Sequence, residues 1–386
     1  MGIFKLFHVE QQHYRALTGI RGWAALWVLF YHAWVIAVPR RINLPLGDWT
    51  LDLTPFFSIG WAGVPIFFVL SGFLLALPFA AWQAGMRERP APGRYLFRRV
   101  VRVFPAYYAQ LLLLLLLAIV LHGQIPLNDL GAVWRHLLML FVPPPLGTTP
   151  LNGVWWTLPI EFSFYLVLPL MAFLLRPSRW WLLLATVVGS MLLWRGVTIS
   201  LLAAETVPVR LLMAYQLPGS LDSFGLGMLG AGLYVNRARL GLAQLSNFYL
   251  AAITTSALLI VVATLYWMHY NYLDYWQHSL IFYTWTPLFG TAISALLFAG
   301  VSGCRLANGL FGNRVMIFYG LISYSVYLWH YPVMGWLLKS DFILGHEGYN
   351  LPRLLSAAVL ITFLLASLSY AFIERPMMRL RRGERR

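Results

Sequence analysis

The chain has 386 residues, of which 60% are hydrophobic and only 11% charged, and its formal net charge is +15. A soluble domain usually carries about 25% charged residues, so this composition excludes an ordinary soluble protein and indicates an integral membrane protein. The single cysteine, Cys304, excludes an internal disulfide and a cysteine-rich metal site. We expect no bound metal.

Runs of about 20 apolar residues, each long enough to cross a bilayer core of about 30 Å, recur along the sequence. They predict an all-α fold, a polytopic membrane helix bundle that forms one integral-membrane domain over residues 1–386. We expect about ten transmembrane helices, at 17–38, 56–79, 105–122, 153–175, 180–200, 212–235, 247–268, 281–301, 315–338 and 353–374.

The distribution of cationic side chains predicts the orientation of this bundle. With both termini cytoplasmic, the inner segments hold 20 lysines and arginines and the outer loops hold six. This bias follows the positive-inside rule. We therefore predict cytoplasmic tails at about 1–16 and 375–386. The positive charge is then a consequence of topology, and no nucleic-acid partner is expected.

The first predicted span contains two ionisable side chains, Arg21 and His32, eleven residues apart. Eleven steps of about 100° return to within roughly 20° of the start, so both side chains lie on one stripe, about 16 Å apart along the axis. Ionisable groups in hydrocarbon are costly and mostly line a path or a site. The pair suits a reaction reached from both membrane faces. The structural alternative is a histidine that only bonds a neighbouring helix.

A dense group of cations, Arg98, Arg99 and Arg102, precedes the third span. Arg98 and Arg102 are four residues apart and share one helical face. The guanidinium fork suits phosphate, to which it forms bidentate hydrogen bonds. The group is interpreted either as a phosphate-binding site or as an ordinary positive-inside anchor.

Three further scarce polar side chains, Glu161, Asp222 and His330, are predicted at the depth of His32, roughly 9–15 Å below the outer surface. Four such groups from four spans indicate one shared cavity. Structural alternatives stay open for each of them. Glu161 would pair with Arg195 or with a histidine, whereas Asp222 and His330 would serve helix packing.

Trp155 opens the fourth span, next to Trp156. An aromatic belt at the membrane surface is the usual reason for tryptophan at such a position. The alternative is a platform on which a sugar ring stacks.

Six segments, in this order, resemble the membrane acyltransferase-3 family of O-acyltransferases. They are 21–32, 63–74, 98–107, 156–166, 322–332 and 372–376. The resemblance implies transfer of an acyl group, usually acetyl, from cytoplasmic acyl-coenzyme A to a hydroxyl of an extracytoplasmic glycan, such as an exopolysaccharide or lipopolysaccharide sugar. It also implies a multi-pass protein of the bacterial inner membrane. The expected partners are acyl-coenzyme A, a glycan or lipid-linked sugar, and membrane lipids, with no cofactor beyond the donor substrate.

The resemblance also assigns roles to residues. The essential arginine–histidine pair of the family maps onto Arg21 and His32, and its acidic residue maps onto Glu161. The basic motif maps onto the three clustered arginines, which with Arg21 would bind acyl-coenzyme A. His32 would act as general base, or would accept the acyl group itself, with Glu161 orienting the imidazole. The residues left as candidates for binding the acceptor are Trp155, Asp222 and His330.

Two alternatives to this function remain at the level of sequence. Buried histidine and acidic residues also fit a transporter or a flippase for an acyl or lipid-linked sugar substrate. The absence of an inverted repeat argues against a transporter. Within enzymes, the acceptor would instead be a lipid or a small molecule.

Overall fold

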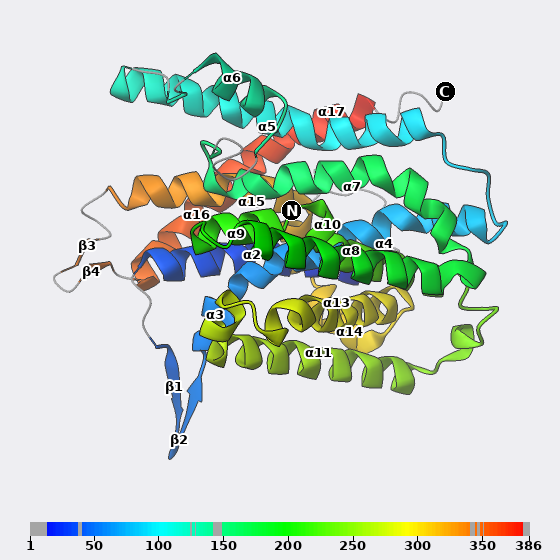
Figure 1. The fold of residues 1–386 in the computed structure, drawn as a ribbon. Helices are drawn as coiled ribbons and strands as arrows, with labels where there is room; N and C mark the ends of the chain where they lie inside the picture. The colour runs from blue at the N-terminus through cyan, green and yellow to red at the C-terminus, as the bar shows by residue number, and fades with distance from the viewer. Residues whose placement is uncertain are drawn as a thin grey trace.

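The computed structural model describes residues 14–37, 41–123, 126–127, 129–141, 149–339, 344–345, 348–349 and 351–380. Long helices dominate it, and most of them run along one common direction (Figure 1). This is the predicted polytopic α-helical fold. Two short hairpins depart from it: β1 (Asn43–Leu46) pairs with β2 (Trp49–Asp52), and β3 (Leu344–Gly345) pairs with β4 (Gly348–Tyr349). Both hairpins lie at the same end of the bundle (Figure 1).

Every predicted span coincides with helical structure. The long helices are α2 (Arg15–Ile36), α4 (Gly63–Gln83), α5 (Pro92–His122), α7 (Thr157–Met171), α8 (Trp180–Leu201), α10 (Leu217–Val235), α11 (Asn247–Tyr270), α13 (Leu280–Val301), α15 (Arg314–Leu337) and α16 (Leu351–Ser369). Shorter helices are α3 (Thr54–Ser58), α6 (Leu130–Leu137), α9 (Val207–Ala214), α12 (Tyr272–Trp276), α14 (Arg305–Phe311) and α17 (Arg375–Leu380).

Two predicted boundaries were wrong. Helix α5 begins at Pro92 rather than near residue 105, because the arginine-rich segment before 105 is itself helical. Arg98, Arg99 and Arg102 therefore lie on α5. The predicted sixth span, 212–235, is broken between α9 and α10, where Pro218 occupies the first turn of the new helix. Within the described part of the chain, seven helical segments are long and apolar enough to cross a membrane. The helices α2, α10 and α15 are not among them, and the number of spans stays a prediction.

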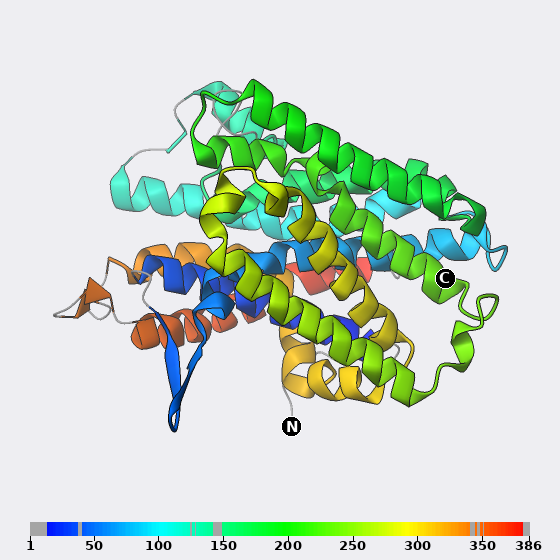
Figure 2. The same cartoon turned by 60° about the horizontal axis from the view of Figure 1, so that its bottom comes forward.

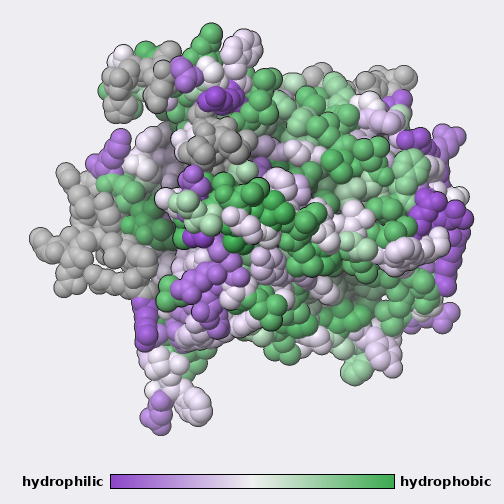
Figure 3. Space-filling view, in the orientation of Figure 1, coloured by the Kyte–Doolittle hydropathy of each residue, from purple (hydrophilic) through white to green (hydrophobic). Residues whose placement is uncertain are grey.

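The surface agrees with a membrane environment. Hydrophobic residues cover much of the middle of the face shown in Figure 3, and hydrophilic residues gather toward its two ends. Large apolar side chains such as Leu112, Leu193 and Leu259 are more than half exposed. An apolar surface of this extent requires a covering partner, and lipid satisfies it.

The centre of the bundle consists of helices packed at very short range. Helix α2 packs against α15 and α4, and α10 packs against α4, α8 and α13. In Figures 1 and 2, α5 lies on one side of this centre and α11 on the other. The crossings depend on glycines whose added Cβ atom would collide with a backbone carbonyl of the facing helix: Gly22 and Gly320 between α2 and α15, and Gly72 and Gly227 between α4 and α10. Small residues allow this close approach of helices in membranes.

A π-helical turn, Tyr370–Glu374, separates α16 from α17. It brings Glu374, which is buried, against Arg102 of α5, with Nη1 and Oε2 2.7 Å apart. The hydroxyl of Ser325 on α15 also donates a hydrogen bond to Glu374. The turn therefore ties α5, α15 and the C-terminal segment together through one buried carboxylate.

Candidate functional site

A pair of histidines links α2 to α15. The Nε2 atom of His330 lies 3.1 Å from Nδ1 of His32. The same Nδ1 of His32 lies 3.0 Å from the carbonyl oxygen of Val28, and Nδ1 of His330 lies 3.1 Å from that of Val326. A carbonyl oxygen only accepts, so each Nδ1 carries the hydrogen and His330 Nε2 is the acceptor. In the neutral ring, Nε2 of His32 is then unprotonated, which is the state required of a general base or nucleophile.

His32 lines a cavity of about 350 Å³, which we call the His32 cavity. Its walls come from α2, α4, α8, α9, α10, α12, α13 and α15 as well as the turns before α4 and α7. Most of the large lining side chains are aromatic: Tyr31, Trp61, Phe68, Trp156, Tyr215, Tyr275, Trp276 and Tyr327. The cavity is large enough for a small ligand, and its rings offer flat apolar faces.

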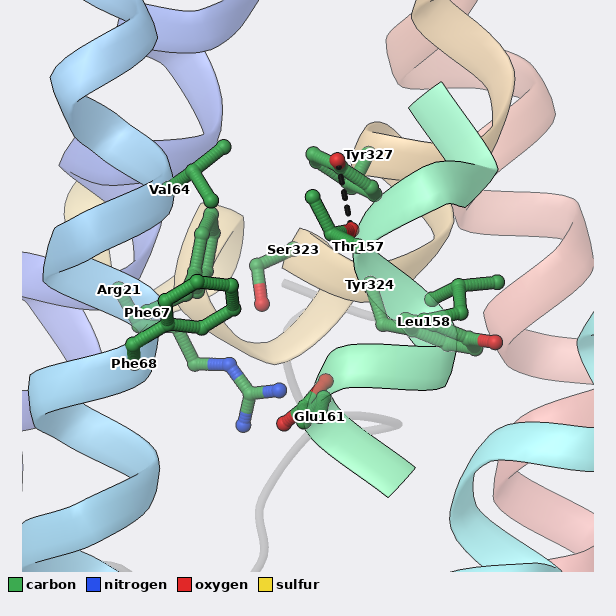
Figure 4. A pocket seen from close by; sticks show the side chains of 10 residues that line it. All are labelled: Arg21, Val64, Phe67, Phe68, Thr157, Leu158, Glu161, Ser323, Tyr324 and Tyr327. Atoms are coloured by element: carbon green, nitrogen blue, oxygen red, sulfur yellow. Dashed lines mark hydrogen bonds between the residues drawn. The ribbon is translucent and has the colours of Figure 1, made fainter. Parts of the chain in front are cut away.

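A second and smaller cavity, of about 40 Å³, contains Arg21, and we call it the Arg21 cavity. Figure 4 shows the guanidinium of Arg21 directed toward the carboxylate of Glu161 across this space. Ser71 of α4 donates a hydrogen bond of 2.8 Å to Oε1 of Glu161. Opposite charges on two helices therefore face one small cavity.

One wall separates the two cavities. Val64, Phe68 and Tyr327 line both of them. The ring of Phe68 stacks on Phe224 with centroids 4.6 Å apart. The hydroxyl of Tyr327 lies 2.8 Å from Oγ1 of Thr157 and from the carbonyl oxygen of Val154. Stacking and hydrogen bonds thus fix the position of this wall, with Arg21 on one side and His32 on the other.

The expectation of a single cavity for the four buried polar groups was wrong. His32 and His330 are in contact, but Glu161 lines the Arg21 cavity and Asp222 lines neither cavity. The predicted contact between Glu161 and the imidazole is therefore replaced by His330. Glu161 remains a candidate on the Arg21 side, where its carboxylate faces the guanidinium.

The candidates for binding the acceptor also change. Trp155 is fully buried and donates its indole hydrogen to Gln110, 2.9 Å away, so its role is structural. Its neighbour Trp156 lines the His32 cavity instead. Asp222 is fully buried on α10, and its carboxylate oxygens have no hydrogen-bond partner among the described residues. His330 touches His32 rather than the cavity.

The arginines of α5 adjoin the Arg21 cavity. The guanidinium carbon of Arg102 lies 5.9 Å from the ring centroid of Tyr324, which lines that cavity. Arg102 is paired with Glu374, so it has a structural role that the sequence did not predict. Arg98 and Arg99 are half-buried beside it, and Nε of Arg99 has no partner in the described part of the chain.

Several residues of the site were not named as candidates from the sequence. Ser71, Phe68 and Tyr327 lie within the segments 63–74 and 322–332, which carry the family resemblance, and this was the signal that could have found them. Arg195 was visible as a charge inside a span. Over the residues that the structure describes, no group of three or more histidine, cysteine, aspartate or glutamate side chains could hold a metal ion.

Comparison with known proteins gives a consistent result. The protein-family model described as "Acyltransferase domain" matches residues 14–372 of this chain. The chain is 28% identical over 338 residues to the exopolysaccharide production protein ExoZ of Rhizobium meliloti, covering 85% of this chain and 93% of the relative. It is 27% identical over 391 residues to the peptidoglycan O-acetyltransferase OatA of Listeria monocytogenes, covering 95% of this chain but 56% of the relative. No solved structure matches it.

Proposed function

This chain belongs to the membrane acyltransferase-3 family, and we propose that it transfers an acetyl or other short acyl group from cytoplasmic acyl-coenzyme A to a hydroxyl of an extracytoplasmic glycan. The family assignment makes it an acyltransferase rather than a transporter. The observation that carries the proposal is the wall shared by two cavities, with Arg21 on one side and His32 on the other. The names of two relatives, an exopolysaccharide production protein and a peptidoglycan O-acetyltransferase, support a glycan acceptor.

The donor is proposed to enter on the Arg21 side. The predicted topology makes this the cytoplasmic side, where acyl-coenzyme A is found. Arg98 and Arg99 would contact its phosphates, because guanidinium groups bind phosphate oxygens in bidentate geometry. Arg21 and His32 are eleven residues apart on α2, about 16 Å along its axis. That length is of the order of the pantetheine arm, so the thioester would reach the wall while the nucleotide stays at the membrane surface.

The acceptor is proposed to bind in the His32 cavity. Unprotonated Nε2 of His32 would take the proton from the acceptor hydroxyl while the hydroxyl oxygen attacks the thioester carbonyl. The carbon–sulfur bond then breaks, and the thiolate recovers the proton from His32, which gives the ester and free coenzyme A. In the second route, Nε2 attacks the thioester first and passes the acyl group to the hydroxyl afterwards. Both routes need the tautomer that the contact with His330 favours.

The test is release of free thiol from acetyl-coenzyme A by purified protein in detergent, with and without glycans from the cell envelope. We expect thiol release that depends on the glycan, together with acetyl ester on the glycan by mass spectrometry. The variant His32→Ala should abolish both signals. Glycan transport without thiol release would contradict the proposal.

A further inference from the structure

We propose that the acceptor carries an anionic group and that Arg195 binds this group in the His32 cavity. This inference rests on the proposed function, because it specifies the chemical class of the acceptor. It starts from a charge that the fold buries without a carboxylate partner.

Arg195 of α8 is fully buried and lines the His32 cavity. Its Nε donates to the carbonyl oxygen of Gly219 at 3.0 Å, and its Nη1 donates to that of Phe282 at 2.7 Å. Its Nη2 has no hydrogen-bond partner among the described residues. The two backbone contacts hold the guanidinium in one orientation, and Nη2 is the nitrogen that they leave without a partner.

Charge neutralisation within the protein does not explain this arginine. In the described part of the chain, no carboxylate oxygen lies within ion-pair distance of Arg195. Asp222 is the carboxylate to consider, because it and Arg195 both influence Tyr215 electrostatically. Asp222 does not line the cavity, however, and no ion pair joins it to Arg195 among the described residues. The guanidinium instead lies over two rings, 5.0 Å from the centroid of Tyr215 and 5.3 Å from that of Phe282. A buried charge left without an anion is destabilising, so an anionic ligand would complete the site.

The rest of the lining is also rich in donors. Five further buried polar atoms belong to residues that line the cavity and have no partner among the described residues: Nε1 of Trp61, the hydroxyls of Tyr215, Tyr275 and Thr286, and Nε1 of Trp276. An indole nitrogen only donates, and an arginine only donates. No aspartate or glutamate lines the cavity. This set complements a ligand with several acceptor oxygens, as in a carboxylate or a phosphate.

The aromatic faces indicate what else the ligand contains. The tryptophan and tyrosine rings that surround the cavity suit the apolar face of a sugar ring, and a volume of about 350 Å³ suits a small ligand or part of a chain. The hydroxyls of the lining can pair with a neutral sugar, but such a sugar offers no negative charge to the guanidinium of Arg195. A sugar that bears a carboxylate or a phosphate matches the lining better. His32 lines the same cavity, so the reacting hydroxyl and the anionic group would be held together.

The experiment measures binding by calorimetry to the purified full-length protein in detergent. The probes are cellobiose, cellobiouronate, in which one hydroxymethyl group is oxidised to a carboxylate, and glucose 1-phosphate. We expect an anionic probe to bind about tenfold or more tightly than cellobiose, as one charge-assisted hydrogen bond provides. Preference for cellobiouronate would identify a carboxylate as the anion, and preference for glucose 1-phosphate would identify a phosphate.

The variant Arg195→Gln should remove this preference, and Arg195→Lys should keep part of it. Arg41→Gln, which changes an exposed arginine in the predicted outer loop before α3, is the matched control and should bind like the wild type. If Arg195→Gln does not fold, Tyr215→Phe, which removes only an unpartnered hydroxyl, should weaken the anionic probe several-fold more than cellobiose.

Equal binding of neutral and anionic probes, binding of none of them, or a preference that survives Arg195→Gln would overturn the inference. These results are distinguishable from failure of the proposed function. A glycan-dependent thiol release without any anion preference contradicts the anionic acceptor alone. If the anion preference depends on Arg195 but no glycan causes thiol release, the proposed enzyme activity is contradicted and the proposed anion-binding site is still supported.

Discussion

The Nε2 atom of His330 accepts a hydrogen bond from Nδ1 of His32, 3.1 Å away, although 298 residues separate the two in the chain. This contact gives His32 the neighbour that a carboxylate provides in a hydrolytic triad, but without a negative charge. His330 is therefore a positioning residue, which fixes the tautomer and the direction of the other imidazole.

Replacing His330 by Ala should lower kcat modestly. The variant loses one hydrogen bond, worth ~1 kcal/mol or roughly a fivefold effect, while Nδ1 of His32 keeps its bond to Val28. His32→Ala should lower kcat by about 10²–10⁴-fold. Steady-state thiol release measures both, and the KM for the donor should not change. Equal loss in the two variants would place His330 in the reaction itself.

Arg21 and His32 should fail in different ways. His32→Ala should still bind coenzyme A by calorimetry, because the change lies beyond the wall of Val64, Phe68 and Tyr327. Arg21→Ala should bind coenzyme A more weakly, since it removes a cation from the side where the donor is proposed to enter. Identical affinities in the two variants would remove Arg21 from donor binding.

The pair of Arg102 and Glu374 allows a structural role to be separated from donor binding. Changing Glu374 alone to Gln should lower the thermal midpoint in detergent, because losing one partner of a buried pair costs about 3–5 kcal/mol. The double variant Arg102→Met with Glu374→Met should recover much of that stability. If Arg102 also binds donor phosphate, the recovered protein will have a raised KM for acetyl-coenzyme A, and an unchanged KM limits Arg102 to the fold.

A single donor arginine is better tested at Arg99, whose Nε is buried without a partner among the described residues. Arg99→Gln should raise the KM for acetyl-coenzyme A several-fold, because one charge-assisted phosphate contact is lost. Arg305→Gln, an exposed arginine on the same predicted face, is the control and should leave the KM unchanged. If the wild type and Arg99→Gln have the same KM, Arg99 does not bind donor phosphate and serves only as a positive-inside membrane anchor.

The orientation is tested by labelling single cysteines from outside intact cells. Leu130→Cys in α6 should react with a membrane-impermeant maleimide, whereas Met86→Cys, between α4 and α5, should not; both positions are more than half exposed. The native Cys304 is buried and should contribute little background. Reaction at residue 86 alone would reverse the topology and with it the side of the donor.

Apolar runs were sufficient to predict the long helices, because each span must satisfy its own backbone hydrogen bonds within one segment. Hydropathy was not sufficient to predict which side chains line each cavity. Depth along a helix follows from residue count, and His32 and His330, which were predicted at one depth, are in contact. Glu161, predicted at the same depth, instead faces Arg21. Rotation around each helix does not follow from residue count. That rotation is set by crossings such as Gly22 with Gly320, where one facing carbonyl decides which side of α2 meets α15.

The ion pair of Arg102 was unpredictable for a related reason. The charge of Glu374 was visible beside the end of the last span, but only the π-helical turn at Tyr370–Glu374 aims it at α5. A turn with one extra residue has no hydropathy signal. The family resemblance placed both residues in matched segments without showing that they touch.

The wall between the two cavities also bears on membrane leakage. A catalyst that passes an acyl group across a bilayer connects two compartments whose ion gradients the cell must keep separate. Phe68, stacked on Phe224, and the hydrogen-bonded Tyr327 lie between Arg21 and His32. Under the proposed function, only a reactive end inserted from the donor side crosses this barrier, while hydrated ions and protons meet hydrocarbon. The wall that separates donor from acceptor would then also limit the passage of ions.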